Sequence, residues 1–239
     1  MTSPFSARPG DTPNRTVVGI DACPAGWVGV ALDQSSHSAA FFGRTVGELL
    51  DTAPPVALIT IDIPIGLPDQ GARAADLAAR EVVGARWQSV FLTPIRAALT
   101  APTYGEANAT ARQQGVAGIS RQAYALRTKI LEVESWLDQA PAPVFEVHPE
   151  VCFATMRSAT LATRKKSWAG MEERRALLRA VGIELASDLG PAGRYANADD
   201  VLDAAAAAWT AQRLLAGTAH PLPDPPEVDS KGHRIAIWA

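Results

Sequence analysis

The first strong pattern in the chain is an apolar segment, residues 17–30, interrupted by one carboxylate and one tight turn. Apolar residues lead up to Asp21, the chain breaks at residues 23–26, and a second apolar run starts at Trp27. This pattern predicts two strands joined by a short turn. An acid at the end of a buried strand is badly placed for a core and well placed for a functional site.

Later segments alternate between strand and helix patterns. Residues 56–65 are apolar on both faces and rich in β-branched side chains, which predicts a central strand of a parallel sheet. The other predicted strands are residues 39–44, 143–148 and 234–238, and the predicted helices are residues 45–51, 71–83, 104–114, 122–137, 171–181 and 198–216. These elements predict an α/β fold, a mixed sheet with helices on both faces.

The same pattern predicts how the chain is divided. Residues 1–15 are polar and carry two prolines, and we expect a loose N-terminal tail there. Residues 16–239 form one predicted domain, and residues 69–140 a helical insertion between its strands. The segment from residue 220 is a proline-rich tail that ends in the last predicted strand.

Acids lie near the carboxyl ends of three predicted strands. Asp21 ends the first strand, Asp62 lies near the end of the central strand, and Glu146 lies near the end of a later one. Ligands bind at the carboxyl ends of strands in such sheets, so we expect the three side chains to converge. The alternatives are turn and backbone contacts for the two aspartates, and an ion pair or a contact with His148 for Glu146.

The last predicted helix brings further acids. Asp200 and Asp203 are three residues apart and share one face, and five alanines from residue 204 onward let this helix lie close to a sheet. Asp199 and Asp203 also share a face, and the spacing does not decide between Asp199 and Asp200 as the inward acid. Each of these acids has an alternative role as a cap or first-turn residue.

Converging carboxylates repel one another, and a hard divalent cation relieves this repulsion. Two such ions about 4 Å apart can activate a water and stabilise the leaving oxygen in phosphodiester hydrolysis. We therefore expect Mg²⁺ or Mn²⁺ to be held by Asp21, Asp62, Asp200 and Asp203. Glu146 is the fifth predicted catalytic residue, as a ligand or to orient the attacking water.

Five segments carry a resemblance to a known family: VVGIDACPAGWVGV, ITIDIPIGLPDQGARAAD, RWQSVFLTPIR, VFEVHPEVCF and DDVLDAAAAAW. They resemble the DUF429 family of bacteria and archaea, which is described as predicted nucleases with a ribonuclease H-like fold. That fold carries acids on its first strand, its fourth strand and a late helix. The resemblance thus implies Asp21, Asp62 and the Asp200/Asp203 pair, whose spacing resembles that of Holliday-junction resolvases. It also makes Glu146 a motif residue.

The composition limits the partners. Of the 239 residues 47% are hydrophobic, and the net charge of −3 shows no bulk basic character of the kind typical of nucleic-acid binding. A local cleft remains the expected DNA or RNA site, lined by Arg73, Arg86, Arg96, Lys129 and Lys166. Ion pairs within the protein, or solvation for Lys166, are the alternatives. Trp87 and Phe91 are expected in the core, with base stacking as the alternative.

Three functions follow as expectations, the first being the metal-dependent nuclease. The second is a phosphotransferase or nucleotide hydrolase of the actin and sugar-kinase type, and the third a non-catalytic binding protein with a degenerate site. The two cysteines have no metal-type spacing, which favours a reducing cytoplasm. No apolar run approaches the roughly 18 residues of a membrane span, so no membrane partner is expected. A homodimer is left open.

Overall fold

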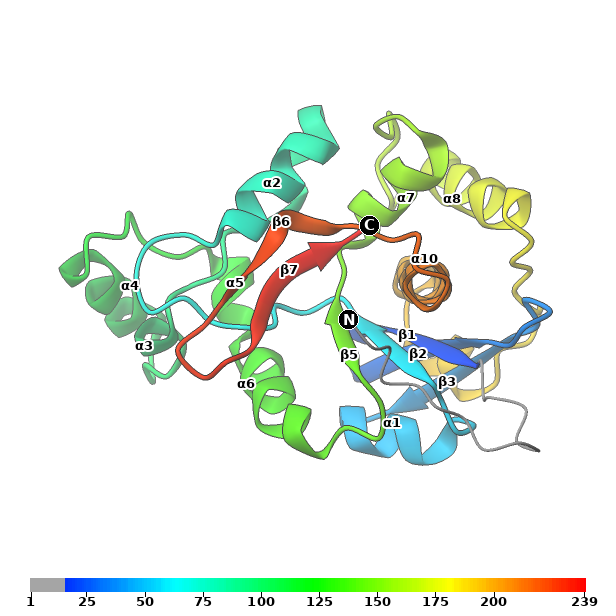
Figure 1. Ribbon diagram of the computed structural model, residues 1–239, viewed down its shortest axis with the longest axis horizontal. Coiled ribbons are helices and arrows are strands. Elements are labelled where there is room, and N and C mark those ends of the chain that lie inside the picture. The colour runs from blue at the N-terminus through cyan, green and yellow to red at the C-terminus, as the bar shows by residue number, and fades with distance from the viewer. Residues whose placement is uncertain (1–15) are drawn as a thin grey trace, which may run out of the picture.

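A five-stranded mixed sheet forms the centre of the computed structural model, which describes residues 16–239. The predicted tail at residues 1–15 lies outside the described residues. The strands are β1 (Val17–Cys23), β2 (Gly26–Leu32), β3 (Ser38–Gly43), β4 (Leu58–Ile61) and β5 (Val144–Glu146). Their order is β3-β2-β1-β4-β5, with β2 antiparallel to both neighbours and β4 parallel to β1 and β5 (Figure 1). The predicted α/β class and the central position of β4 are confirmed.

Most of the helices lie between β4 and β5 in the sequence. They are α2 (Ala74–Val83), α3 (Arg96–Leu99), α4 (Tyr104–Gln113), α5 (Arg121–Ala125) and α6 (Arg127–Trp136), with short 3-10 helices at Gly84–Ser89 and Leu137–Gln139. In Figure 1 these helices extend to the left of the sheet. The remaining helices are α1 (Val46–Thr52), α7 (Pro149–Arg157), α8 (Trp168–Ala180), α9 (Pro191–Tyr195) and α10 (Ala198–Leu215).

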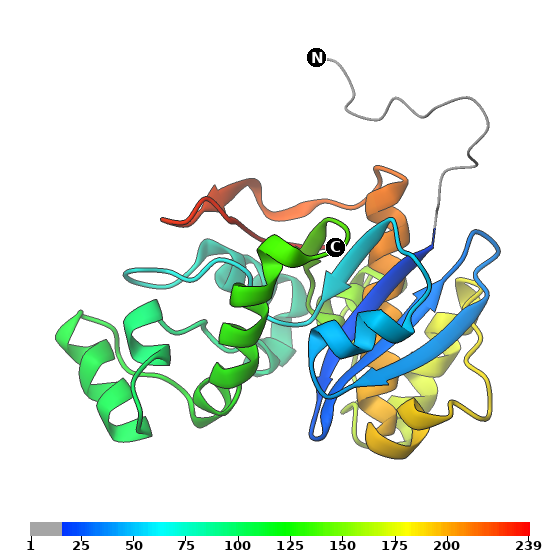
Figure 2. The same ribbon diagram turned by 90° about the horizontal axis from the view of Figure 1, so that it is seen from below.

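The two faces of the sheet are covered by different helices. Alternation along β1 sends Val18 and Ile20 into a core that also holds α1 and α6 residues, whereas Val17 packs into a core shared with α10. Figure 2 shows α1 and α10 on opposite sides of the strands. Asp21 follows Val17 in this alternation and therefore faces α10.

The long helix α10 lies unusually close to β1. A Cβ atom on Gly19 would lie 2.0 Å from the backbone nitrogen of Ala208, so only glycine fits beneath the helix. Thr60 of β4 also donates its hydroxyl to the carbonyl of Ala207 at 2.8 Å. The alanine run thus lets α10 lie close to the sheet, as expected from its small side chains. This close packing fixes the distance between the first turn of α10 and the strand ends.

Two local features were not expected from the sequence pattern. Pro149, which lies beyond the end of β5, starts helix α7, where its missing N–H costs no helix bond. The proline-rich segment near the C-terminus forms strand β6 (Pro221–Val228), paired with β7 (Arg234–Trp238). β6 lies at the edge of a two-stranded sheet and is interrupted by a register shift, which is where prolines are tolerated in strands.

None of the helices in residues 16–239 has both the length and the hydropathy that crossing a membrane requires.

Candidate functional site

Asp21 and Asp62 form the base of the candidate site. Ile20 of β1 is aligned with Ile61 of β4, so the next residue of each strand comes to the same sheet edge. The backbone amide of Asp62 donates to the carbonyl of Ile20 at 2.9 Å, which closes this end of the parallel pair. The two carboxyl groups share a side-chain hydrogen bond.

The first turn of α10 supplies the acids above this pair. Asp203 is 1% exposed, and its Oδ1 is buried without a hydrogen-bond partner. Asp200 is also buried and lines the same cavity, but its Oδ2 caps the helix by accepting from both nitrogens of Asn197 at 3.0 and 2.9 Å. Asp199 does not line the cavity and lies to one side, near a lysine.

That lysine, Lys165, enters the acidic cluster from the loop between α7 and α8. Its Nζ lies 2.6 Å from Oδ2 of Asp203 and 3.8 Å from Oδ2 of Asp199. The sequence pattern pointed instead to its neighbour Lys166, which is exposed. Adjacent residues of an irregular loop have no periodicity, so no signal in the sequence could have shown which of the two points inward.

Burial and mutual repulsion set the protonation of the acids. Burial raises the pKa of Asp21 well above its usual range, and Asp62 and Asp203 raise it further. Burial raises the pKa of Asp62 and of Asp203 to about 6 each, although Lys165 works in the opposite direction. Burial would lower the pKa of Lys165, but Asp203 and Asp21 hold it above its ordinary value. The lysine therefore stays charged, while the acids are poised to bind a cation or a proton.

The acids line one wall of a cavity of about 330 Å³. His148 lines it too, with Nε2 3.3 Å from the carbonyl of Ser89 and Nδ1 buried without a hydrogen-bond partner. Burial lowers the pKa of His148, so its ring is neutral at pH 7. Phe91 also lines the cavity instead of belonging to a core. Trp87, expected in the core, is 48% exposed and lies beneath the guanidinium of Arg80.

Glu146 lies in the cavity wall, but both of its oxygens are engaged by the protein. Oε1 lies 2.7 Å from Nη2 of Arg73, and Oε2 accepts from Nη1 of Arg73 and from the backbone amide of Ile65, each at 2.7 Å. Arg73 also pairs with Asp76 at 2.5 Å. Burial alone would lower the pKa of Arg73, and Glu146 with Asp76 raises it above its ordinary value. This network holds the chain just after Asp62 in place.

The other predicted substrate-binding cations have partners within the protein as well. Arg86 donates to the carbonyl of Thr163 at 2.8 Å and pairs with Glu150 at 3.3 Å. Lys129 donates to the carbonyl of Gly26, and Arg96 forms ion pairs with acidic side chains outside the cavity. Lys166, by contrast, makes no ion pair with any residue that the structure describes.

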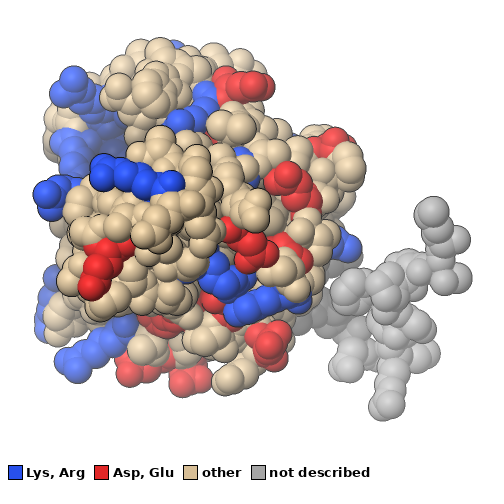
Figure 3. Space-filling model, turned by 90° about the vertical axis from the view of Figure 1, so that its left-hand side faces the viewer, with Lys and Arg blue, Asp and Glu red and all other residues tan. Residues whose placement is uncertain are grey.

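Figure 3 shows the face of the molecule at the left of Figure 1, where the helices between β4 and β5 lie. Lys and Arg side chains are interspersed there with Asp and Glu side chains. This face is therefore not a single-sign basic surface of the kind that binds nucleic acid through phosphate contacts alone.

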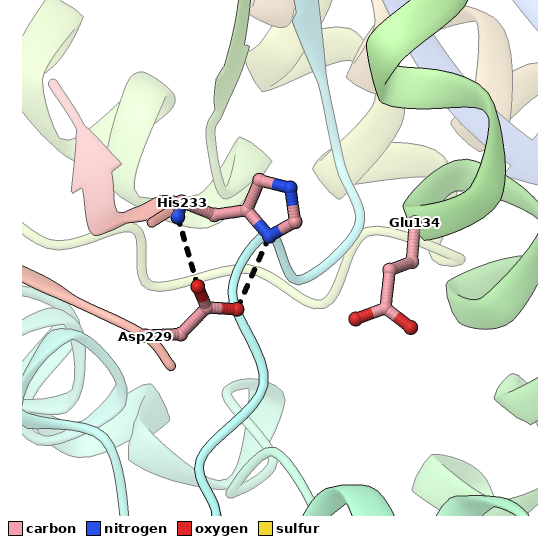
Figure 4. Close-up of side chains that lie close together, drawn as sticks. All are labelled: Glu134, Asp229 and His233. Atoms are coloured by element: carbon pink, nitrogen blue, oxygen red, sulfur yellow. Dashed lines mark hydrogen bonds and ion pairs between the residues drawn. The ribbon is translucent and has the colours of Figure 1, made fainter. Parts of the chain in front are cut away.

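A second group of potential ligands has no signal in the sequence. Glu134 of α6, Asp229 and His233 offer oxygen and nitrogen atoms that all lie within 4.8 Å of one another. Figure 4 shows His233 bonded to Asp229 through its backbone amide and its ring, with Glu134 standing apart. Arg96 pairs with both acids, and Lys231 lies 3.4 Å from Glu134. The group is an ion-pair network that ties the β6–β7 hairpin to α6.

The four predicted metal ligands do not form one compact cluster of oxygen atoms in the described residues. In residues 16–239, no three of Asp21, Asp62, Asp200 and Asp203 bring their carboxylate oxygens within 4.8 Å of one another. Asp21 and Asp62 are close, and Asp203 stands farther off with Lys165 on one of its oxygens. The site thus consists of an acidic pair at the strand ends and a second acidic group on α10.

Comparison with known proteins gives a family but no activity. The model of a protein family of unknown function, DUF429, matches residues 19–228. No curated protein and no solved structure matches the chain.

Proposed function

The chain belongs to the DUF429 family, whose description names no activity, and from the geometry of its acidic site we propose a divalent-metal-dependent phosphodiester hydrolase that acts on DNA or RNA. One observation carries the proposal: Oδ1 of Asp203 is buried without a partner, in a cavity wall shared with the paired carboxylates of Asp21 and Asp62. An unsatisfied buried acceptor beside two repelling acids is costly unless a cation joins them.

The fold supports the proposal as well. Asp21 lies near the end of the first strand, Asp62 follows the fourth and Asp203 lies on a late helix. The order β3-β2-β1-β4-β5 with one antiparallel strand is consistent with the ribonuclease H-like fold that the sequence resemblance implies. Function in such folds resides in the site rather than in the topology, so this support is secondary to the acids.

The donor set suits a hard divalent cation, Mg²⁺ or Mn²⁺. All candidate donors are carboxylate oxygens, and neither buried cysteine lines the cavity. Asp21 and Asp62 would hold the ion, and Asp200 and the free oxygen of Asp203 would complete its coordination through water. When bound, the metal would lower the pKa of an attacking water and neutralise charge on the phosphate.

The protein groups around the acids have separate tasks in this proposal. The Arg73–Glu146 pair fixes the backbone after Asp62 and so orients that carboxylate; this makes Glu146 a positioning residue instead of a ligand. Lys165 places a positive charge on the cavity wall, where it can donate to a phosphate oxygen. His148 is neutral and offers one free nitrogen as an acceptor.

The test combines metal binding with cleavage. Wild-type protein with Mg²⁺ or Mn²⁺ is expected to cleave single-stranded, duplex or branched DNA or RNA. The variants Asp21→Asn and Asp62→Asn are each expected to lose both cleavage and metal affinity. Asp51→Asn, at an exposed position of α1, is the matched control. Absence of metal binding and of cleavage in the wild type would overturn the proposal, and thermal stabilisation by ATP would point to a phosphotransferase instead.

A further inference from the structure

The acids of the candidate site fall into two groups that a cation could join. Asp21 and Asp62 share a hydrogen bond at the strand ends. Asp203 and Asp199, four residues apart on α10, both lie within 4 Å of one cation, the ammonium of Lys165. The chain itself therefore supplies one cation to the acids of α10, and none of its ion pairs involves Asp21 or Asp62 among the residues that the structure describes.

Lys165 is presented to the acids by a loop that is fixed on both sides. Before it, the carbonyl of Thr163 accepts from Arg86 at 2.8 Å. After it, the hydroxyl of Ser167 donates back to the carbonyl of Arg164 at 2.7 Å, and a Cβ on Gly170 would lie 1.9 Å from that same carbonyl oxygen. A solvated surface lysine needs no such support, because it gains little from a fixed backbone.

The lysine and a metal ion compete for the same carboxylate. Oδ2 of Asp203 lies 2.6 Å from Nζ of Lys165, which leaves Oδ1 as its unused oxygen. A divalent ion bound to Oδ2 at about 2.1 Å would lie within repulsive distance of the ammonium. Asp203 is only 1% exposed, so its unused Oδ1 is the atom through which this carboxylate can contact a ligand other than the lysine.

Resting on the proposed function, we propose that the ammonium of Lys165 takes the place of a second metal ion, so that the site binds one divalent ion, between Asp21 and Asp62. The tethered cation holds the second position without having to be recruited from solution. The same ammonium then meets the substrate phosphate from the α10 side of the cavity.

The experiment counts the ions bound by the full chain. Mn²⁺ is titrated into wild type and Lys165→Met, and bound ions are counted by calorimetry and by the loss of the free-ion electron paramagnetic resonance signal. Wild type is expected to bind one ion and Lys165→Met two. Lys165→Arg, which keeps the charge, and Lys166→Met, which alters the exposed neighbour, are both expected to bind one.

Two results overturn the inference while leaving the proposed function intact: wild type binding two ions, or folded Lys165→Met still binding one. No ion bound to wild type sinks the proposed function itself. If Lys165→Met fails to fold, Asp203→Asn and Asp62→Asn decide, because Asp203→Asn should still bind one ion, at lower affinity, and Asp62→Asn should bind none. Loss of the ion in Asp203→Asn would show that the two positions are not separate.

Discussion

Asp62 lies beside Asp21 because its backbone amide donates to the carbonyl of Ile20 at 2.9 Å, where the parallel pairing of β1 with β4 ends. The two carboxyl groups share a hydrogen bond, and burial raises the pKa of both. Their proximity therefore follows from the strand register. Because both backbones are fixed by the sheet, the two side chains cannot move far apart. A buried acidic pair of this kind makes the stability of the fold depend on pH.

The metal-free protein is expected to lose stability as the pH rises from about 4 to 6. The pKa of Asp62 is about 6 in the folded state and about 3.9 when unfolded, so the folded state binds the extra proton in this range. The free energy of unfolding should fall by roughly 2 kcal/mol through this group. Urea unfolding of wild type and Asp62→Asn at several pH values measures it.

The pH dependence of the free energy of unfolding must be compared between wild type and Asp62→Asn, because His148 changes this free energy in the opposite direction in both proteins. Burial lowers the pKa of His148, so its contribution grows as the pH rises. A wild-type profile parallel to that of Asp62→Asn would contradict the assigned pKa of Asp62.

Glu146→Gln is expected to destabilise the protein without abolishing metal binding. The substitution leaves Arg73 buried with Asp76 as its remaining charged partner, and breaking a buried ion pair costs about 3 kcal/mol. Denaturant unfolding and Mn²⁺ titration of the same sample separate the two effects. Loss of metal affinity with unchanged stability would make Glu146 a ligand, as the sequence pattern first suggested.

Gly19→Ala is expected to disrupt the packing of α10 on β1. The added methyl group would lie 2.0 Å from the backbone nitrogen of Ala208 and 2.3 Å from the carbonyl oxygen of Ala204, and helix backbone cannot yield locally. We expect a loss of about 3 kcal/mol or more in the free energy of unfolding. Because α10 carries Asp203, metal affinity should fall as well.

Gly47→Ala serves as the control for this substitution. Gly47 lies in α1, and a Cβ there would come no closer than 3.9 Å to its nearest neighbour. Alanine should stabilise this helix by about 0.5–1 kcal/mol. Equal effects of the two substitutions in thermal unfolding would contradict the close approach of α10 to β1.

Lys166 and Arg96 are expected to differ in their contributions to nucleic-acid binding. Lys166 is exposed beside Lys165, so Lys166→Ala should weaken binding and reduce the salt slope by about 1. Arg96 is paired with Glu134 and Asp229, so Arg96→Ala should lower stability and leave the slope unchanged. Fluorescence anisotropy with a labelled oligonucleotide at several salt concentrations measures both, and an effect confined to Arg96→Ala would reverse the assignment.

The features of this protein that depend on short-range periodicity can be predicted from its sequence. Alternation along β1 set Asp21 on the face opposite Ile20, and the apolar run before Asp62 made β4 a central strand. The alanines after Asp203 allowed a close helix, and Thr45 caps α1 as its spacing to Glu48 predicts. Each of these features is set by neighbours within a few residues, so the sequence pattern contains them.

Which charged side chains form ion pairs depends on how the whole chain packs. Lys165 reaches Asp203 across 38 residues from a loop, and Arg73 reaches Glu146 across 73 residues from the position before α2, so no helix or strand period sets the direction of either side chain. The pairing of β6 with β7, and the bridge between Trp238 and Val147, likewise have no signal in the proline-rich sequence of β6. A buried charge takes whichever opposite charge the packing brings close, because desolvation makes an unpaired one costly. The acids could therefore be predicted as a set, but the lysine among them and the arginine that holds Glu146 could not.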